Sequence, residues 1–366
     1  MNSSILEKYA NLLVGYCLEI KKGDKLYINS STAGEPLVRE VFRAATRAGG
    51  IVEYNLSFSE ESRIQMKYAD GDQLTHQPIL HAHAMEHFDA YLAIRAPHNL
   101  VENHDIDKEK KKIRSAAMKS MSEHYFRRTA DGSMVRSLCQ YPTQASAQMA
   151  GMSLEEYSDF VFNACRLYDD DPKASWLEVR KNQQHIVDYL NKVDKLQYIS
   201  KGTDISFSVK DRIWINSDGR TNMPSGEVFT GPIEDSVNGT VHFNFPSVYS
   251  SQAVKGITLE VTDGKVENWS AEEGKELLDE IFEIAGARYF GEVAIGTNYN
   301  IQQATKNILF DEKIGGTIHM AVGQSYLQTG AKNKSAIHWD MITDMTQAGQ
   351  IIADGTLIYE NGKFLI

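Results

Sequence analysis

The spacing of apolar residues changes near residue 194, and this change constrains the fold more than any other feature of the sequence. Before it, stretches with the periodicity of strands alternate with stretches that have the periodicity of helices. After it, short strand-like stretches follow one another, with turns of glycine, asparagine and aspartate between them. The first arrangement is typical of an open α/β sheet, and the second of an α+β domain. We therefore expect an N-terminal open α/β domain at residues 1–193 and a C-terminal α+β domain at residues 194–366.

The N-terminal part is expected to contain strands at residues 25–29, 51–56 and 88–96. A helix at about residues 35–48 lies between the first two strands, and Gly49-Gly50 ends it. Residues 131–143 have no clear periodicity, so we expect irregular structure there. Further helices are expected at residues 154–167 and 174–193.

The C-terminal part is expected to contain short strands, one long helix and a terminal hairpin. A capping box at Ser270 to Glu273 opens the helix, which should run from about Ala271 to Phe290. The dipeptide Asn361-Gly362 stands between two strand-like stretches and predicts a type I′ turn.

Charge and composition disfavour several classes of partner. The net charge of -11 would repel phosphate backbones, and no basic stripe offsets it, so nucleic acid is not expected as a partner. The first 25 residues lack the features of a secretory signal, and no apolar run approaches the length of a membrane span. The three cysteines are far apart and not in C-x-x-C spacing, which favours a reducing compartment, the cytoplasm.

An H-x-D pair in an expected strand is the first candidate for chemistry. Ile, Trp and Ile alternate with polar residues over 335–342, so His338 and Asp340 should point to the same face of a strand. An imidazole beside a carboxylate forms half of a site for zinc, cobalt or manganese. Taken alone, such a pair is more often a structural or surface contact than a metal site.

Three further residues stand where their side chains are unusual. His319 lies among apolar residues of an expected strand at 316–323, where it could also be a hydrogen-bonded core histidine. Glu292 follows the expected helix, at an end where the macrodipole disfavours a carboxylate, although a solvated helix end would tolerate it. Glu227 follows a turn at Pro224-Ser225-Gly226 that would aim it at a strand, although it could be an ordinary surface glutamate.

Together these residues have the composition of a paired-ion site. Two histidines and three carboxylates are enough to hold two divalent ions with a bridging water, as in dinuclear hydrolases. One ion would acidify the water, and the other would polarise a carbonyl or bind a free amine. Tyr326 could donate a hydrogen bond to the oxyanion, or it could be a structural tyrosine.

The segments around these residues resemble peptidase family M29, the thermophilic-type metallo-aminopeptidases. The similar segments are 222–232, Gly291-Glu292, 319–326 and 337–340, and the resemblance spans nearly the whole chain. It implies a C-terminal metal-binding catalytic domain, a homodimer whose partner helps to enclose the active site, and cleavage of peptides that have a free N-terminus.

By the same resemblance, two ions among zinc, cobalt, magnesium and manganese are expected. Their implied ligands are Glu227, Glu292, His319, His338 and Asp340. Tyr326 falls on the active-site tyrosine of the family, and we assign to Glu292 a catalytic role as the bridging carboxylate. The segment 327–337 is shorter than in better-known members, so it could change the preferred peptide.

Three alternatives compete with this interpretation. His83, Glu86 and His87 match the H-x-x-E-H pattern of a mononuclear zinc protease, but a third ligand is needed and the segment directly precedes a strand. An iron oxygenase begins its ligand set with H-x-D and ends it with a later histidine, and no histidine follows Asp340. A non-catalytic peptide-binding protein of the same fold would not need Tyr326.

Overall fold

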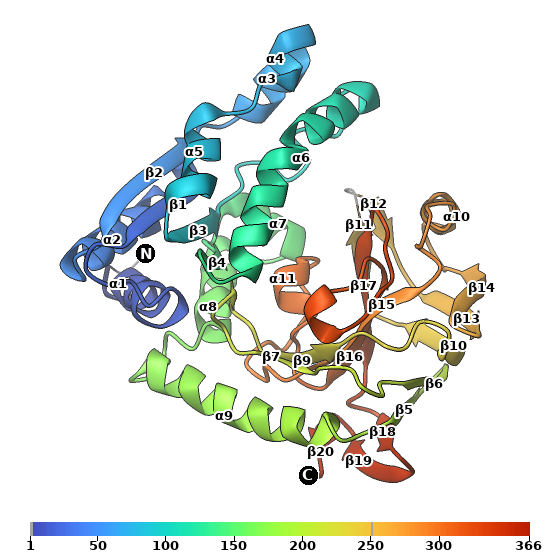
Figure 1. Ribbon diagram of the computed structural model, residues 1–366. Helices are drawn as coiled ribbons and strands as arrows, with labels where there is room; N and C mark the ends of the chain where they lie inside the picture. The colour runs from blue at the N-terminus through green and yellow to red at the C-terminus, as the bar shows by residue number, and fades with distance from the viewer. Residues whose placement is uncertain (1–2, 250–251) are drawn as a thin grey trace. The chain divides into compact units, whose positions relative to one another are not determined.

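The computed structural model describes residues 3–249 and 252–366 (Figure 1). The chain divides into two compact units. Unit 1 comprises Met1–Lys173 and Gly219–Met223, and unit 2 comprises Ala174–Asp218 and Pro224–Ile366. Unit 1 contains a parallel sheet and unit 2 contains antiparallel sheets, so the expected combination of α/β and α+β architecture is confirmed.

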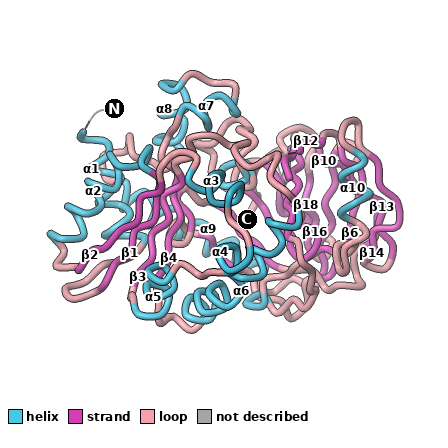
Figure 2. Tube along the Cα trace, turned by 90° about the horizontal axis from the view of Figure 1, so that it is seen from above, coloured by secondary structure: helices cyan, strands magenta, loops and turns pink. Residues whose placement is uncertain are grey.

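Unit 1 is built on a five-stranded parallel sheet of order β2-β1-β3-β4-β8. Figure 2 shows β2, β1, β3 and β4 side by side in this order. The strands are β1 (Lys25–Ser31), β2 (Ile51–Ser57), β3 (Ala90–Arg95), β4 (Val135–Gln140) and β8 (Asn222–Met223). The three expected strands are thus confirmed as β1, β2 and β3.

The expectation of irregular structure at residues 131–143 is wrong, because β4 lies there. Its sequence, Val-Arg-Ser-Leu-Cys-Gln, has only weak alternation. The strand instead pairs along its whole length with β3, from Ala90 with Val135 to Arg95 with Gln140. Pairing in the sheet therefore decides the conformation of this segment, which its own pattern does not reveal.

Helices precede and follow these strands in unit 1. The expected helix at residues 35–48 is confirmed as α2, and Gly49 beyond it has a φ of +87°. The helices of unit 1 are α1 (Ser3–Leu12), α2 (Glu35–Arg47), α3 (Glu61–Tyr68), α4 (Gly71–Thr75), α5 (Ile79–His87), α6 (Lys108–Ala130), α7 (Gln144–Ala150) and α8 (Leu154–Ala164). In the ranges described, no helix combines the length and the apolar character that crossing a membrane would require.

Unit 2 begins with α9 (Pro172–Leu190) and continues into two antiparallel sheets and a hairpin. The eight-stranded sheet has the order β14-β13-β10-β6-β5-β18-β19-β20. Its strands are β5 (Lys195–Ser200), β6 (Thr203–Ser208), β10 (Asn238–Phe243), β13 (Ile257–Thr262), β14 (Lys265–Ser270), β18 (Gln350–Ala353), β19 (Thr356–Glu360) and β20 (Lys363–Phe364).

The five-stranded sheet of unit 2 has the order β17-β16-β15-β9-β7. Its strands are β7 (Ile215–Ser217), β9 (Glu227–Thr230), β15 (Phe290–Gly296), β16 (Thr317–Gly323) and β17 (His338–Asp344). Unit 2 also contains the hairpin of β11 (Ser247–Tyr249) and β12 (Gln252–Val254), and the short helices α10 (Lys275–Ile281) and α11 (Ile308–Asp311).

One hydrophobic core joins the two sheets of unit 2. The five-stranded sheet contributes Val228, Val293, Ile295, Ile318, Met320, Val322, Trp339 and Met341, and the eight-stranded sheet contributes Leu196, Tyr198, Ile205, Phe207, Val241, Phe243 and Leu259. Each large apolar side chain buried in this way stabilises the fold by roughly 1.5–3 kcal/mol. Because alternate residues of a strand point to opposite faces, the other face of the five-stranded sheet is left for different side chains.

The long helix expected at residues 271–290 is wrong in most of its length. Helix α10 spans only Lys275–Ile281, and its N-terminal cap is Gly274 with a φ of +80°. Ser270 is the last residue of β14, and Phe290 already begins β15. Pairing of β15 with β16 and β9 on its two sides outweighs the helical pattern of the segment, so Glu292 lies within a strand.

The terminal hairpin is confirmed as β19 and β20. Asn361 and Gly362 both have positive φ, +48° and +83°, as a type I′ turn requires. Glu360 pairs with Lys363 directly beside the turn.

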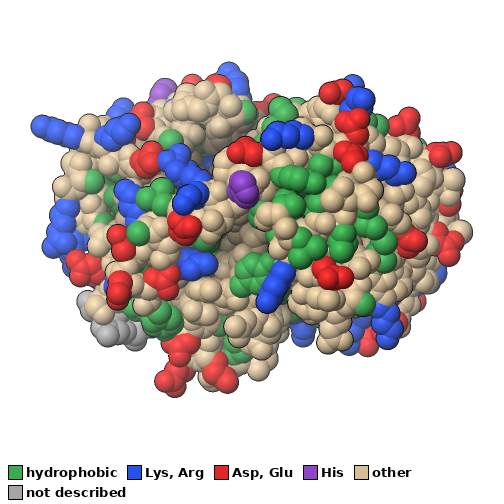
Figure 3. Space-filling model, turned by 90° about the horizontal axis from the view of Figure 1, so that it is seen from below, with side chains coloured by type: hydrophobic (Ala, Val, Ile, Leu, Met, Phe, Trp, Pro, Cys, Tyr) green, Lys and Arg blue, Asp and Glu red, His purple; other side chains and the backbone are tan. Residues whose placement is uncertain are grey.

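Charged side chains of both signs are mixed on one face of the molecule. On the face seen in Figure 3, the side chains of Lys and Arg are interspersed with those of Asp and Glu. This arrangement agrees with the mixed order of acidic and basic residues along the sequence.

Candidate metal centre

The five candidate ligands lie on one face of the five-stranded sheet, opposite the core. Residues that pair across antiparallel strands point to the same face. Ala321 pairs with Glu292 on one side and with Asp340 on the other; the further paired positions are Ala294 with His319, Gly323 with His338, and Gly296 with Glu227. Strands β9, β15, β16 and β17 therefore bring all five side chains together, although they are far apart in the sequence.

Small residues stand beside the candidate ligands and leave room for them. The neighbours across the strands are alanine or glycine: Ala294, Gly296, Ala321 and Gly323. At Gly291, just before Glu292, an added Cβ would lie 2.5 Å from the carbonyl oxygen of Gln324. This glycine is therefore needed for the close approach of the two chain segments at the site.

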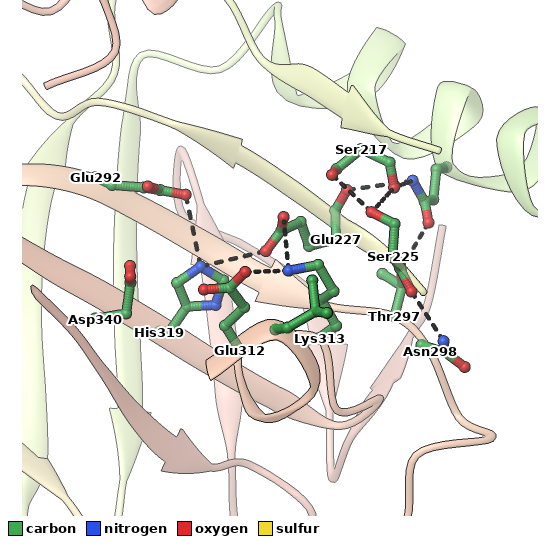
Figure 4. A network of polar contacts seen from close by, with 12 residues as sticks. Ser217, Ser225, Glu227, Glu292, Thr297, Asn298, Glu312, Lys313, His319 and Asp340 are labelled. Atoms are coloured by element: carbon green, nitrogen blue, oxygen red, sulfur yellow. Dashed lines mark hydrogen bonds and ion pairs between the residues drawn. The ribbon is translucent and has the colours of Figure 1, made fainter. Parts of the chain in front are cut away.

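The distances place Glu292 between the two histidines (Figure 4 shows Glu292, His319 and Asp340). His319 Nε2 lies 3.4 Å from Glu227 Oε2 and 3.5 Å from Glu292 Oε1. His338 Nε2 lies 3.1 Å from Glu292 Oε2 and 3.3 Å from Asp340 Oδ1. Each oxygen of Glu292 thus faces a different imidazole.

These side chains form two groups of three that could each hold a metal ion. The groups are Glu227, Glu292 and His319, and Glu292, His338 and Asp340; within each, the ligand atoms lie within 4.8 Å of one another. Glu292 belongs to both groups. The arrangement has the donors of two adjoining ion sites that share one carboxylate.

Buried oxygen atoms at the site fit the binding of cations. Glu227 and Asp340 are only 5% and 9% exposed. In the described part of the chain, Glu227 Oε2 and Asp340 Oδ1 accept no hydrogen bond, although an imidazole Nε2 lies 3.4 and 3.3 Å from them. Leaving a buried carboxylate oxygen without a hydrogen bond is costly, and metal coordination is one of the ways in which proteins offset this cost. The donor set therefore fits divalent ions.

The imidazole of His338 is oriented by a backbone carbonyl. Its Nδ1 lies 2.8 Å from Gln324 O, so Nδ1–H donates to this oxygen and Nε2 is left to face Glu292 and Asp340. The Gln324 side chain in turn accepts a hydrogen bond of 3.1 Å from Ser335 N–H. A ligand histidine held in this way is a common feature of protein metal sites.

The turn before Glu227 is fixed by close packing. Gly226 has a φ of +118°, and an added Cβ would lie 2.6 Å from Asn298 Cβ. Asn298 Nδ2 donates to Ser225 O over 2.8 Å, and Gln183 Nε2 donates to Glu227 O over 3.2 Å. These contacts set the direction in which the Glu227 side chain enters the site (Figure 4).

The neighbouring charges shift the pKa values of both histidines. Burial alone would lower the pKa of His319, but Glu292 and Glu227 raise it to about 9. Burial also opposes the charged form of His338, and Asp340 and Glu292 raise its pKa to about 12. An arriving metal ion would have to displace these protons, so its affinity should rise with pH.

Tyr326 lies beside the candidate ligands. Its ring centroid is 5.1 Å from that of His338 and 5.5 Å from that of Phe229. Loss of water around the hydroxyl raises the pKa of Tyr326, and the charges of Glu292 and Asp340 raise it further. The phenol therefore stays protonated near neutral pH and can act as a hydrogen-bond donor.

The structure adds two residues that the sequence did not single out, Glu312 and Lys313. They follow α11, and the Lys313 side chain is 0% exposed. Its Nζ contacts Glu312 and lies 3.7 Å from Glu227 Oε1. In the sequence, these two residues belong to the charged run Asp311-Glu312-Lys313 between apolar Phe310 and Ile314. Such a run is typical of an ordinary solvated turn, so it does not indicate a buried site.

A cavity of about 90 Å³ adjoins His338 and Asp340. Many of the residues that line it are apolar: Phe245, Pro246, Val248, Ile308, Trp339 and Ile342. Its other polar lining residues include Lys306 and Asp311. The cavity could accept a small or medium apolar group directly beside the candidate metal centre.

The rival H-x-x-E-H residues lie on α5 in unit 1 and remain largely exposed. The rings of His83 and His87 are 4.3 Å apart, and His87 Nε2 lies 3.6 Å from Glu86 Oε2. The side chains of His87 and Glu86 are 49% and 58% exposed. Over residues 3–249 and 252–366, the groups that could hold a metal ion do not include them.

Comparison with known proteins gives matches along the whole chain. The sequence profile described as thermophilic metalloprotease (M29) matches residues 2–364. Aminopeptidase 2 of Geobacillus stearothermophilus is 30% identical, over 92% of this chain and 91% of that protein.

Two solved structures have similar folds. Wild-type AmpT from Thermus thermophilus has a TM-score of 0.87 at 22% identity and covers 99% of both chains. The 2,5-dihydroxypyridine dioxygenase of Pseudomonas putida KT2440 has a TM-score of 0.60 at 14% identity and covers 100% of this chain and 98% of its own. At these identities the likeness concerns the fold alone.

Proposed function

Because the chain belongs to the thermophilic metalloprotease family M29, we propose that it is a metal-dependent aminopeptidase that removes N-terminal residues from peptides. The observation that carries this proposal is the position of Glu292, which is shared by two groups of candidate ligands. The match to Aminopeptidase 2 over most of both chains supports the same reaction.

In this proposal the site holds two divalent ions, with Glu292 as the bridging carboxylate. Glu227 and His319 complete one half, and His338 and Asp340 complete the other. When bound, such ions polarise a scissile carbonyl and lower the pKa of a water molecule. The ions are drawn from zinc, cobalt, magnesium and manganese, which suit imidazole and carboxylate donors to different degrees.

The other residues of the site bind and orient the peptide. Tyr326 donates its hydroxyl proton in a hydrogen bond to the oxygen that becomes negative in the transition state. The neutral amine of a free N-terminus would supply a lone pair to one of the bound ions and be held there. The cavity beside His338 receives the side chain of the first residue, and its apolar lining favours an aliphatic one such as leucine.

We also propose that the protein works as a homodimer in the cytoplasm, without nucleic acid or membrane as a partner. The homodimer follows from the family resemblance. In support of a reducing compartment, Cys17, Cys139 and Cys165 are buried and not joined by disulfides in the described part of the chain.

The reaction class is tested with matched peptides. The protein should hydrolyse leucyl anilides and short leucyl peptides, lose this activity on chelation, and regain it with cobalt, zinc or magnesium. The same peptides with an acetylated N-terminus should remain intact, because the blocked end has no free amine for a bound ion to hold. Efficient internal cleavage of the acetylated peptides would rule out an aminopeptidase.

A further inference from the structure

Lys313 is a fully buried lysine beside the candidate metal centre. Its side chain is 0% exposed, whereas lysines are almost never fully buried unless they are paired. Two carboxylates face its ammonium group: Glu312, in direct contact, and Glu227, at 3.7 Å (Figure 4). A positive charge is therefore built into the site next to a candidate ligand.

The backbone fixes Lys313 in relation to Glu227. The carbonyl oxygen of Lys313 accepts a hydrogen bond of 3.0 Å from Asn298 N–H. The side chain of the same Asn298 donates to Ser225 O, and Gly226 packs against its Cβ. One residue thus holds both the loop of Lys313 and the turn that precedes Glu227, and the ion pairs with Glu312 and Glu227 keep the ammonium group between them.

The charges of the site make its two halves unequal. The carboxylates are Glu227, Glu292, Glu312 and Asp340. Lys313 and one divalent ion nearly balance the charge of these carboxylates when the ligand histidines are neutral. A second divalent ion then gives the site a net positive charge. Like charges repel strongly in a buried site, because water screens them poorly. The half that contains Glu227 bears this repulsion, since Lys313 lies against it.

We propose that Lys313 makes the two ions bind in order. The first ion binds tightly to Glu292, His338 and Asp340, and the second binds weakly to Glu227, Glu292 and His319. Lys313 acts as a positioning residue that balances charge while the second half is empty. This inference rests on the dinuclear site of the proposed function, and it makes full loading depend on the concentration of free divalent ions.

The test is a calorimetric titration of zinc or cobalt into metal-free protein. The wild type should show two steps, with the second ion bound about 10-fold or more weakly than the first. Lys313→Gln keeps N–H donors toward Glu227 and Glu312 but removes the charge. It should tighten the second step by about 10-fold or more and leave the first nearly unchanged. Lys313→Met should act in the same direction.

Lys334→Met is the matched control, because it removes a lysine charge from an exposed position of the same unit. Solvent screens that charge, so both binding steps should stay as in the wild type. Circular dichroism checks that each variant is folded. The wild-type titration alone shows whether the two ions bind with unequal affinity, so the test does not depend on the folding of a variant.

Two outcomes would overturn the role of Lys313 and leave the dinuclear site standing. One is a wild type that binds two ions with equal affinity, and the other is a second step that Lys313→Gln leaves unchanged. A wild type that binds no ion at all would overturn the proposed function itself.

Discussion

Replacing Glu292 with glutamine is expected to abolish metal binding and peptide hydrolysis together. The two oxygens of Glu292 face His319 and His338 at 3.5 and 3.1 Å, so the residue contributes to both halves of the site. Glu292→Gln keeps the shape of the side chain but removes its charge and one acceptor oxygen. Losing a residue that only orients a metal ligand lowers metal affinity or activity by about 10–100-fold. Losing this shared carboxylate should therefore lower activity by more than about 100-fold.

The matched control is Glu86→Gln in the H-x-x-E-H segment. The substitution is the same, but Glu86 is 58% exposed on α5 and belongs to neither group of candidate ligands. Bound metal, measured by mass spectrometry, and hydrolysis of a leucyl substrate should both remain at wild-type levels, and likewise in His83→Ala. The opposite pattern, with Glu292→Gln active and the α5 variants inactive, would assign the chemistry to the H-x-x-E-H residues.

Tyr326→Phe is expected to lower kcat by about 10²–10³-fold without removing metal, the usual cost of losing one donor to a developing oxyanion. The phenol lies beside His338, and its raised pKa keeps the proton in place. KM should change little, because the hydrogen bond strengthens mainly in the transition state.

Tyr299→Phe provides the control for Tyr326. Tyr299 lies in the same unit and donates its hydroxyl to Gly362 O over 2.8 Å, so its loss should cost some stability but leave kcat unchanged. A Tyr326→Phe enzyme with unchanged kcat would contradict the donor role. A Tyr326→Phe protein without bound metal would show a structural role instead.

The spacing of residues within one strand was readable from the sequence, but pairing between strands was not. His338 and Asp340 alternate with apolar residues, and β17 confirms that this segment is a strand. Glu292 illustrates the limit: its preceding segment has a helical pattern, but pairing with β16 and β9 makes residues 290–296 a strand. Such pairing depends on partners distant in the chain, which a local pattern does not contain.

Lys313 shows the same limit for electrostatics. In the sequence it is an ordinary lysine next to a glutamate, a pair that usually belongs to a solvated surface. In the structure Lys313 lies between α11 and β16, where Asn298, from the loop after β15, hydrogen bonds to its backbone and the side chain is buried. No periodicity within residues 308–316 distinguishes this lysine from an exposed one.

The fold by itself does not decide the chemistry. AmpT of Thermus thermophilus and the dioxygenase of Pseudomonas putida both have folds similar to that of this chain, although their names denote different reactions. Function therefore has to be argued from the side chains of the site. In this chain, two groups of candidate metal ligands meet at Glu292.

The most direct test of this account is the number of metal ions bound per chain. The wild-type protein would be equilibrated with saturating zinc, dialysed against the same free zinc concentration, and assayed for zinc and protein. The account predicts two ions per chain. One ion per chain would contradict the shared role of Glu292, and none would contradict the metal centre as a whole.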